Sequence, residues 1–236
     1  MDSPEVSFVI PVFDEEAILH AAIVDLRERL APHDLRYEII LAENGSRDAT
    51  AAVAQQLGAR YPEVRLVQSP VPNYGAALRQ GIASARGHWV ICEEIDLCDV
   101  DFQLRALALL RAGGADFVIG SKLLGDSRDE RPRLRHLASQ LYTGILHLLF
   151  DFRGTDTHGL KAFRRSLVAP IAEACLVERD VFASELVIRA YREPLNIVEI
   201  PVRVLEKRPP SINLLRRLPN VAKNLAQLVW AIRLKG

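Results

Sequence analysis

The sequence predicts an α/β fold, with a Rossmann-like, mostly parallel sheet flanked by helices and a C-terminal amphipathic helical extension. One observation is that short β-branched runs alternate with segments of helical period over the first hundred residues, as in βαβ units. Another is that the runs 6–12 and 90–92 are each followed by carboxylates. In α/β proteins, nucleotides and their metals bind at the carboxyl ends of parallel strands.

Composition sets the outer limits. The chain has 236 residues, of which 49% are hydrophobic and 25% are charged, so it can bury a large core as one globular domain. Its 30 basic and 30 acidic residues give zero formal net charge, which provides no field favouring nucleic acid. The cysteines have no CxxC spacing, so we expect a reducing compartment without a disulfide framework or zinc knuckle.

The first strand is expected at Val6–Val12 and the first helix at Glu15–Leu30. Apolar residues recur in that helix at four-residue spacing, from Ile18 to Leu30, which predicts a helix packed on a sheet. The remaining elements expected in this half are, in order, strand Tyr37–Leu41, helix Ala49–Arg60, strand Val64–Gln68, helix Ala76–Arg86 and strand Trp89–Cys92.

The second half is predicted to hold a helix at Leu104–Arg111 and strands at Phe117–Gly120 and Ile197–Val204. Between them, Gly125–Arg135 is rich in charged residues around one proline. We expect this stretch to form a mobile loop that could act as a lid.

His136–Phe150 contains no Asp, Glu, Lys or Arg and carries leucines at helical spacing. Fifteen residues are too few to span a bilayer, so the pattern predicts either a buried helix or one lying in a membrane interface.

The last segment, Ile212–Gly236, combines an apolar face with five Lys and Arg residues and no acid. This pattern fits a basic amphipathic helix on an anionic membrane, or a terminal helix packed on the domain. We therefore divide the chain into a domain at 1–211 and a helical tail at 212–236. Neither a signal peptide nor a run of eighteen apolar residues is seen, so we expect a cytoplasmic protein whose membrane contact, through the tail, is peripheral and at the cytoplasmic face.

Four motifs occur in a recognisable order. Val9–Glu16 is similar to VIPVYNEE, Ile39–Thr50 to VVDDGSxDGT and Asn73–Ile82 to N-x-G-x-A-x-x-x-G, and Glu94-Ile95-Asp96 stands at the place of an Asp-x-Asp motif. With these motifs the chain resembles family 2 glycosyltransferases of the GT-A fold, above all the polyprenyl-phosphate sugar transferases typified by dolichyl-phosphate mannose and glucose synthases. The matching residues run from Val6 to about Ser211.

The resemblance implies a nucleotide site. By it, Pro11, Phe13 and Glu15 line the pocket, and Glu43 accepts from the base. Two further positions are Gly75, which lets the backbone approach the nucleotide, and Arg208, a diphosphate ligand. From the residues alone, the acids after the first strand could equally be first-turn carboxylates favoured by a helix dipole. Residues 43–50 could equally form a Gly turn and a helix cap.

The resemblance also implies a metal site, in which Glu94 and Asp96 hold Mg²⁺ or Mn²⁺ against the donor diphosphate. Glu94 replaces the family's first aspartate, and Cys98 stands where a glutamine often supports the metal. An alternative register would use Glu93 or Asp99 instead.

On the acceptor side, Gly120-Ser121-Lys122 is similar to the family's Gly-Ser-Arg, and Arg135 with Ser139 matches its Arg-x-x-x-Ser. By resemblance Lys122 and Arg135 meet the acceptor phosphate and, with Asp96, form the catalytic set. Asp156–Arg164 is similar to D-T-x-C-G-F-K-A-F-R, in which Asp156 and Lys161 are candidates for ordering the site.

The resulting hypothesis is an inverting hexosyltransferase. It would move a sugar from a UDP- or GDP-linked donor to a polyprenyl phosphate, with no nucleic-acid partner. One alternative keeps the donor chemistry but uses a soluble acceptor, whose hydroxyl would need a base such as Glu185 or Asp99. A second alternative is a catalytically degenerate relative that binds nucleotide without turnover.

Overall fold

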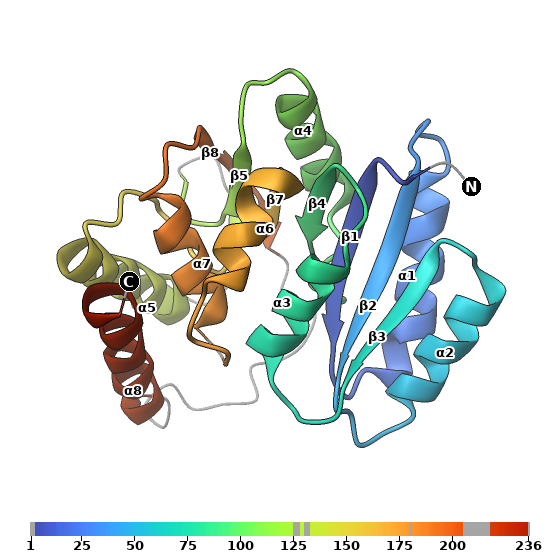
Figure 1. The fold of residues 1–236 in the computed structure, drawn as a ribbon, viewed down its shortest axis with the longest axis horizontal. Helices are drawn as coiled ribbons and strands as arrows, with labels where there is room; N and C mark the ends of the chain where they lie inside the picture. The colour runs from blue at the N-terminus through green and yellow to red at the C-terminus, as the bar shows by residue number, and fades with distance from the viewer. Residues whose placement is uncertain (1–2, 125–127, 130–132, 180, 205–217, 236) are drawn as a thin grey trace.

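The computed structural model describes residues 3–124, 128–129, 133–179, 181–204 and 218–235, and its centre is a seven-stranded sheet of order β3-β2-β1-β4-β7-β5-β8 (Figure 1). Every pairing is parallel except those of β7, which runs antiparallel to β4 and β5. The predicted mostly parallel sheet is confirmed. Its strands are β1 (Val6–Val12), β2 (Tyr37–Asn44), β3 (Val64–Ser69), β4 (Trp89–Cys92), β5 (Phe117–Ser121), β7 (Lys161–Arg164) and β8 (Ile197–Pro201).

Helices cover both faces of the sheet, and this is why its strands are apolar on both sides. Along β1, Phe8 and Ile10 join one hydrophobic core, whereas Val9 joins the other. The first core is completed by α1 (Glu16–Leu30), α2 (Thr50–Arg60) and α4 (Val100–Arg111), and the second by α3 (Tyr74–Ser84), α6 (Arg165–Glu173) and α7 (Phe182–Ala190) (Figure 1).

The second core also receives α5 (Arg133–Phe150), α8 (Leu218–Val229) and the π-helical turn η2 (Trp230–Leu234). Arg189 and Arg192 donate to the carbonyls of Ala231 and Ile232. The C terminus lies beside α5 (Figure 1), and the Arg233 guanidinium donates to the Leu149 carbonyl at 2.8 Å. The described part of the tail is therefore a terminal helix packed on the domain. The first part of the predicted tail, 212–217, which includes Leu214 and Leu215 of the predicted apolar face, lies outside the described residues.

Part of the predicted lid loop is regular structure. Arg128–Asp129 forms β6, which pairs with β9 (Arg203–Val204), and α5 begins at Arg133 instead of His136. The expected strand Ile197–Val204 is split for a related reason. Its partner β5 ends at Ser121, so the chain leaves the large sheet after Pro201 and pairs with β6.

Helix α5 is buried along one face only, and its contact with a membrane interface stays a prediction. Leu146 and Phe150 are buried, but Leu137, Leu141 and Leu148 are exposed. Among the described residues, no helix combines the length and the apolar character needed to cross a membrane.

Candidate active site

The candidate site lies at one edge of the sheet, where several parallel strands end. The register of β1 and β2 places Val12 opposite Glu43, and that of β1 and β4 places Val9 opposite Cys92. The carboxylate-bearing loops after β1, β2 and β4 therefore emerge side by side, as expected for parallel strands.

The loops after β1 and β2 are fastened to each other. The Asp14 N–H donates to Ser46 Oγ at 3.1 Å, and its carboxylate accepts from the Arg47 N–H at 2.7 Å. The Glu15 N–H donates to Thr50 Oγ1 at 2.7 Å. Asp14 adopts a positive φ of 53°, a conformation that aspartate tolerates better than most residues. These bonds fix the two loops before any ligand arrives.

The predicted nucleotide residues of these loops lie together. Pro11 is buried in β1, Phe13 is half-buried with the Arg47 guanidinium 6.0 Å from its ring centre, and Glu15 is the N-cap residue of α1. Glu43 is buried, and its Oε1 accepts from the Ser46 N–H at 2.6 Å. The turn interpretation of Glu43 is thus observed, and its contact with a base stays a prediction.

Gly75 lies in the first turn of α3, next to the site. A Cβ atom at Gly75 would stand 1.8 Å from the Glu178 carbonyl oxygen. The close approach that requires glycine in this structure is therefore to the protein's own backbone. Its proposed contact with the nucleotide stays a prediction.

The turn after β4 carries the variant metal motif. The Leu97 N–H donates to the Glu94 carbonyl at 3.0 Å, and the buried Cys98 thiol faces the Glu94 and Ile95 carbonyls, each at 3.8 Å. Cys98 thus supports the turn that carries Glu94 and Asp96.

Tyr74 fixes the Glu94 side chain. Its hydroxyl, at the start of α3, donates to Glu94 Oε1 at 2.9 Å. Burial raises the pKa of Glu94, against the opposing effects of the Tyr74 bond and the Lys161 ammonium. Burial and the neighbouring Glu94 together raise the pKa of Tyr74 well above its usual value, so the phenol is a proton donor at neutral pH. The longer glutamate is held in one place by this bond.

Two carboxylates on one turn fit a hard divalent cation, which often takes one or two carboxylates and completes its shell with substrate phosphates and water. Among the described residues, no three His, Cys, Asp or Glu side chains group as metal ligands. A cation held by Glu94 and Asp96 would therefore need oxygens from the donor diphosphate.

The alternative metal register is not supported by the geometry. Glu93 is buried beneath α4, where its Oε1 accepts from Gln103 Nε2 at 3.0 Å. Burial raises its pKa to about 8. Asp99 instead caps α4 by accepting from the Phe102 N–H at 3.1 Å.

Lys122 follows β5 and forms the cationic side of the site. Its Nζ lies 3.2 Å from Asp156 Oδ2, and both side chains are largely buried. Burial raises the pKa of Asp156, but the Lys122 charge and the His158 N–H outweigh it and leave that pKa below its usual value. Lys161 is buried nearby, donates to the Gly159 carbonyl at 2.6 Å and has its pKa lowered by burial.

The loop that carries Asp156 is tightly anchored. The Thr155 N–H and the Tyr191 hydroxyl donate to Glu199 Oε1 at 2.8 and 3.1 Å. A Cβ atom at Gly159 would stand 1.8 Å from the Gly120 carbonyl oxygen, so this loop presses directly on β5. These contacts hold the Asp156 loop in place, independently of the ion pair between Asp156 and Lys122.

Some predicted residues cannot be placed in the site. The side chain of Arg135 and the whole of Arg208 lie outside the described residues, although the Arg135 backbone belongs to α5. Glu185, a candidate base for a hydroxyl acceptor, is fully buried, and its carboxylate accepts from the Leu176 and Val177 N–H groups and from Arg189. Its role is structural.

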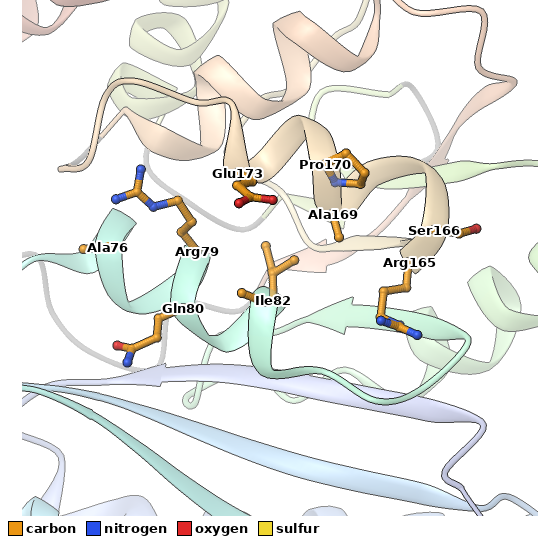
Figure 2. Close-up of a pocket in the computed structure, with 10 residues that line it drawn as sticks. Ala76, Arg79, Gln80, Ile82, Arg165, Ser166, Ala169, Pro170 and Glu173 are labelled. Carbon is orange, nitrogen blue, oxygen red and sulfur yellow. The ribbon is translucent and has the colours of Figure 1, made fainter.

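A hollow of about 640 Å³ lies apart from these residues, between α3 and α6 (Figure 2). Arg79 and Glu173 come from its opposite walls. The Arg79 guanidinium already donates to the Cys175 carbonyl at 3.1 Å and to Glu178 at 2.5 Å. None of the predicted site residues lines this hollow.

A family model described as "Glycosyl transferase family 2" matches residues 7–171, which include the loops after β1, β2, β4 and β5. The chain belongs to glycosyltransferase family 2. The resemblance inferred from the four motifs is thus confirmed.

Among curated family 2 relatives, the glycosyltransferase AglD of Haloferax volcanii is 26% identical over 238 residues, covering 98% of this chain and 38% of AglD. The dolichyl-phosphate beta-glucosyltransferase ALG5D of Trichomonas vaginalis is 28% identical over 219 residues, covering 85% of this chain and 66% of ALG5D. The chain spans less than half the length of AglD.

Solved structures show the same fold. Glucosyl-3-phosphoglycerate synthase from Mycobacterium tuberculosis, in complex with Mn²⁺, UDP-glucose and phosphoglyceric acid, gives a TM-score of 0.67 at 20% identity over 97% of this chain and 80% of that one. Its complex with Mg²⁺ and UDP gives 0.66 at 19% identity, over 97% and 79%. The predicted GT-A fold is confirmed.

Proposed function

We propose that this family 2 member is an inverting hexosyltransferase that moves a sugar from a UDP- or GDP-linked donor to a polyprenyl-phosphate acceptor. One observation carries the proposal: Glu94 and Asp96 after β4, Lys122 after β5 and Lys161 at the start of β7 lie at one edge of the sheet. The Glu94 carboxylate is within electrostatic reach of both lysines. A site with both signs of charge suits two phosphorylated substrates, one bound through a cation and one directly.

On the donor side, we assign the nucleotide to the fastened loops after β1 and β2. Pro11, Phe13 and Glu15 would line it, Glu43 would accept from the base, and Gly75 would border it. Arg208 is proposed as a diphosphate ligand on the family resemblance alone. Because the loops are already hydrogen-bonded to each other, binding would cost little ordering entropy.

Glu94 and Asp96 would hold Mg²⁺ or Mn²⁺, which when bound neutralises the charge that develops on the diphosphate leaving group. Tyr74 keeps Glu94 at the turn by its hydrogen bond. The Glu94 side chain is one methylene longer than aspartate, and this hydrogen bond fixes the position of its carboxylate.

On the acceptor side, Lys122 and Arg135 would hold the acceptor phosphate, and Asp156 positions Lys122 through the buried ion pair. A phosphate monoester has its second pKa at about 6, so its oxygen is already ionised at neutral pH. Attack on the anomeric carbon from the face opposite the leaving group then needs orientation and no strong base.

A soluble acceptor is the second candidate, since glucosyl-3-phosphoglycerate synthase, of the same fold, was crystallised with phosphoglyceric acid. The similarity to dolichyl-phosphate beta-glucosyltransferases favours the lipid instead. The hydrogen bonds of Glu185 also leave it unsuited as the base for a hydroxyl acceptor. Peripheral membrane contact through 212–236 and a cytoplasmic location remain our predictions.

The test is transfer to a short polyprenyl phosphate from a panel of UDP- and GDP-sugars, with Mn²⁺ or Mg²⁺ and with EDTA. We expect cation-dependent glycosyl-lipid with one donor class and its loss in Asp96→Ala. Donor hydrolysis with transfer only to phosphorylated metabolites would establish the soluble alternative. Nucleotide binding without hydrolysis or transfer would establish the degenerate one.

A further inference from the structure

The exposed apolar side chains of this protein are concentrated in one region. In the described part of the chain, eight large hydrophobic side chains are exposed, and five of them belong to α5 and η2. The other three are scattered as single residues, which is ordinary for a soluble surface. The five are Leu137, Leu141, Leu148, Trp230 and Leu234, and the others are Val71, Leu167 and Leu176.

The three leucines of α5 form a stripe. Leu137, Leu141 and Leu148 are 60%, 66% and 82% exposed and lie four and seven residues apart, a spacing that keeps side chains on one helix face. Gly144 falls between them, and nothing lies within 4 Å of the place where its Cβ would be. We call this face the leucine stripe. It faces open space, while Leu146 on the opposite side is buried.

Charge distinguishes this region from the rest of a neutral protein. Neither Arg133–Phe150 nor the described tail, 218–235, contains an acidic residue. Lys223 and Lys235 are exposed on the tail. Arg233 joins the tail to the end of α5 through the Leu149 carbonyl and pairs with the exposed Asp151, which follows α5, at 3.1 Å. The leucine stripe thus belongs to a surface whose two helices carry exposed apolar side chains and no acidic residue.

We propose that the leucine stripe, with the adjoining tail helix, docks on an anionic membrane surface. Leucines inserted below the headgroups and lysines at their level are the combination such a surface binds. A second copy of this chain is a poorer partner, because it would bring the exposed Lys223 and Lys235 of two tails together. The inference deepens the proposed function and rests on it, since a polyprenyl-phosphate acceptor lies in a membrane.

The placement also fits the acceptor side of the site. Arg135, proposed to meet the acceptor phosphate, belongs to the same helix as the stripe. A helix lying along the membrane would hold this position of the chain within about a helix diameter of the headgroup level, where an acceptor phosphate lies.

The experiment is co-sedimentation of the 236-residue chain with vesicles of phosphatidylcholine alone or with 30% phosphatidylglycerol, without polyprenyl phosphate. The test variant is Leu137→Asn/Leu141→Asn/Leu148→Asn. The matched control is Val71→Asn/Leu167→Asn/Leu176→Asn, which changes the same number of exposed apolar side chains elsewhere. Unfolding midpoints of both variants verify that they fold.

We expect the wild type and the control to bind the anionic vesicles, weakly at high salt, and the stripe variant to bind about tenfold less or worse. Equal binding by a folded stripe variant, or no vesicle binding by the wild type, would overturn the inference. So would wild-type self-association that the stripe variant loses in sedimentation velocity without any vesicle binding. Transfer to a short, water-soluble isoprenoid phosphate is measured in parallel. Its survival in the stripe variant would separate membrane docking from the proposed chemistry.

Discussion

The proposed donor side and the proposed acceptor side of this protein are built differently. Five hydrogen bonds join the loop after β1 to the loop after β2. The proposed acceptor side instead combines a buried ion pair, Lys122–Asp156, with a helix on which three leucines face outward. The donor loops are thus held by hydrogen bonds within the chain, whereas the acceptor side has a buried cation held by a carboxylate and an exposed apolar helix face.

The largest expected effect is a loss of stability on the proposed acceptor side, when the buried Lys122–Asp156 ion pair is removed. Asp156→Ala removes the carboxylate that faces the largely buried Lys122 ammonium, and we expect a loss of about 3–5 kcal/mol in the free energy of unfolding. Urea denaturation measures it. Asp156→Asn, which keeps the volume and one oxygen, should lose less. A change within about 1 kcal/mol for Asp156→Ala would mean that the ion pair does not organise this side.

A second change tests the buried carboxyl group of Glu93, which precedes the proposed metal ligand Glu94. The pKa of Glu93 lies near 8, raised by burial from an ordinary 4.5. Between these values the unfolded chain releases this proton and the folded chain keeps it, so stability falls as pH rises from about 4.5 towards 8. Glu93→Gln removes that dependence. Its stability relative to wild type should increase by on the order of 1–3 kcal/mol between pH 5 and 8.5.

Urea unfolding of Glu93→Gln and the wild type at pH 5 and at pH 8.5 measures this gain in relative stability. Glu63→Gln is the control, because Glu63 forms a partly exposed ion pair with Arg27 at 2.5 Å. A relative stability that is independent of pH, or that falls with rising pH, would show that Glu93 is ionised in the folded protein.

The next change tests the hydrogen bond that holds Glu94 on the proposed donor side. Tyr74→Phe removes the hydrogen bond to Glu94 while keeping the ring, and we expect about tenfold weaker Mn²⁺ binding in the presence of UDP, or about 1.4 kcal/mol. Titration calorimetry measures it, with Tyr37→Phe, at the start of β2, as the control. Unchanged Mn²⁺ affinity would remove Tyr74 from the site.

The smallest expected effect concerns the fastened loops. Thr50→Val removes the oxygen that accepts from the Glu15 N–H at the start of α1, and we expect a loss of about 1 kcal/mol in unfolding free energy. Thr50→Ser keeps the hydroxyl and should lose less. If both variants match the wild type, the donor loops are not fastened in the way we describe.

The donor half was the more predictable from sequence. Each of its strands and helices has its own period, and β1 to β4 appear in the structure close to their expected bounds. The acceptor half depends on long-range pairing. The segment Lys161–Arg164 is too short for its sequence to predict a strand. It forms β7 because it pairs with β4 on one side and β5 on the other.

The candidate site divides in the same way. Glu94, Asp96 and Lys122 could be found because they follow apolar strands and match a known motif. Nothing in the sequence pointed to Tyr74, since its partner Glu94 is twenty residues away and only the packing of α3 against β4's turn joins them. The burial of Glu93 and Glu185 could not be predicted either, because the sequence does not show which neighbouring elements pack over a glutamate.

The most direct test of the account compares two acceptors of one chain length, farnesyl phosphate and farnesol, with the preferred nucleotide sugar and Mn²⁺. Our account predicts transfer to the phosphate and none to the alcohol. It also predicts that Lys122→Ala reduces transfer to the phosphate by about a hundredfold, as expected for loss of a charged contact to the reacting group. Comparable transfer to farnesol, or full activity of Lys122→Ala, would contradict it.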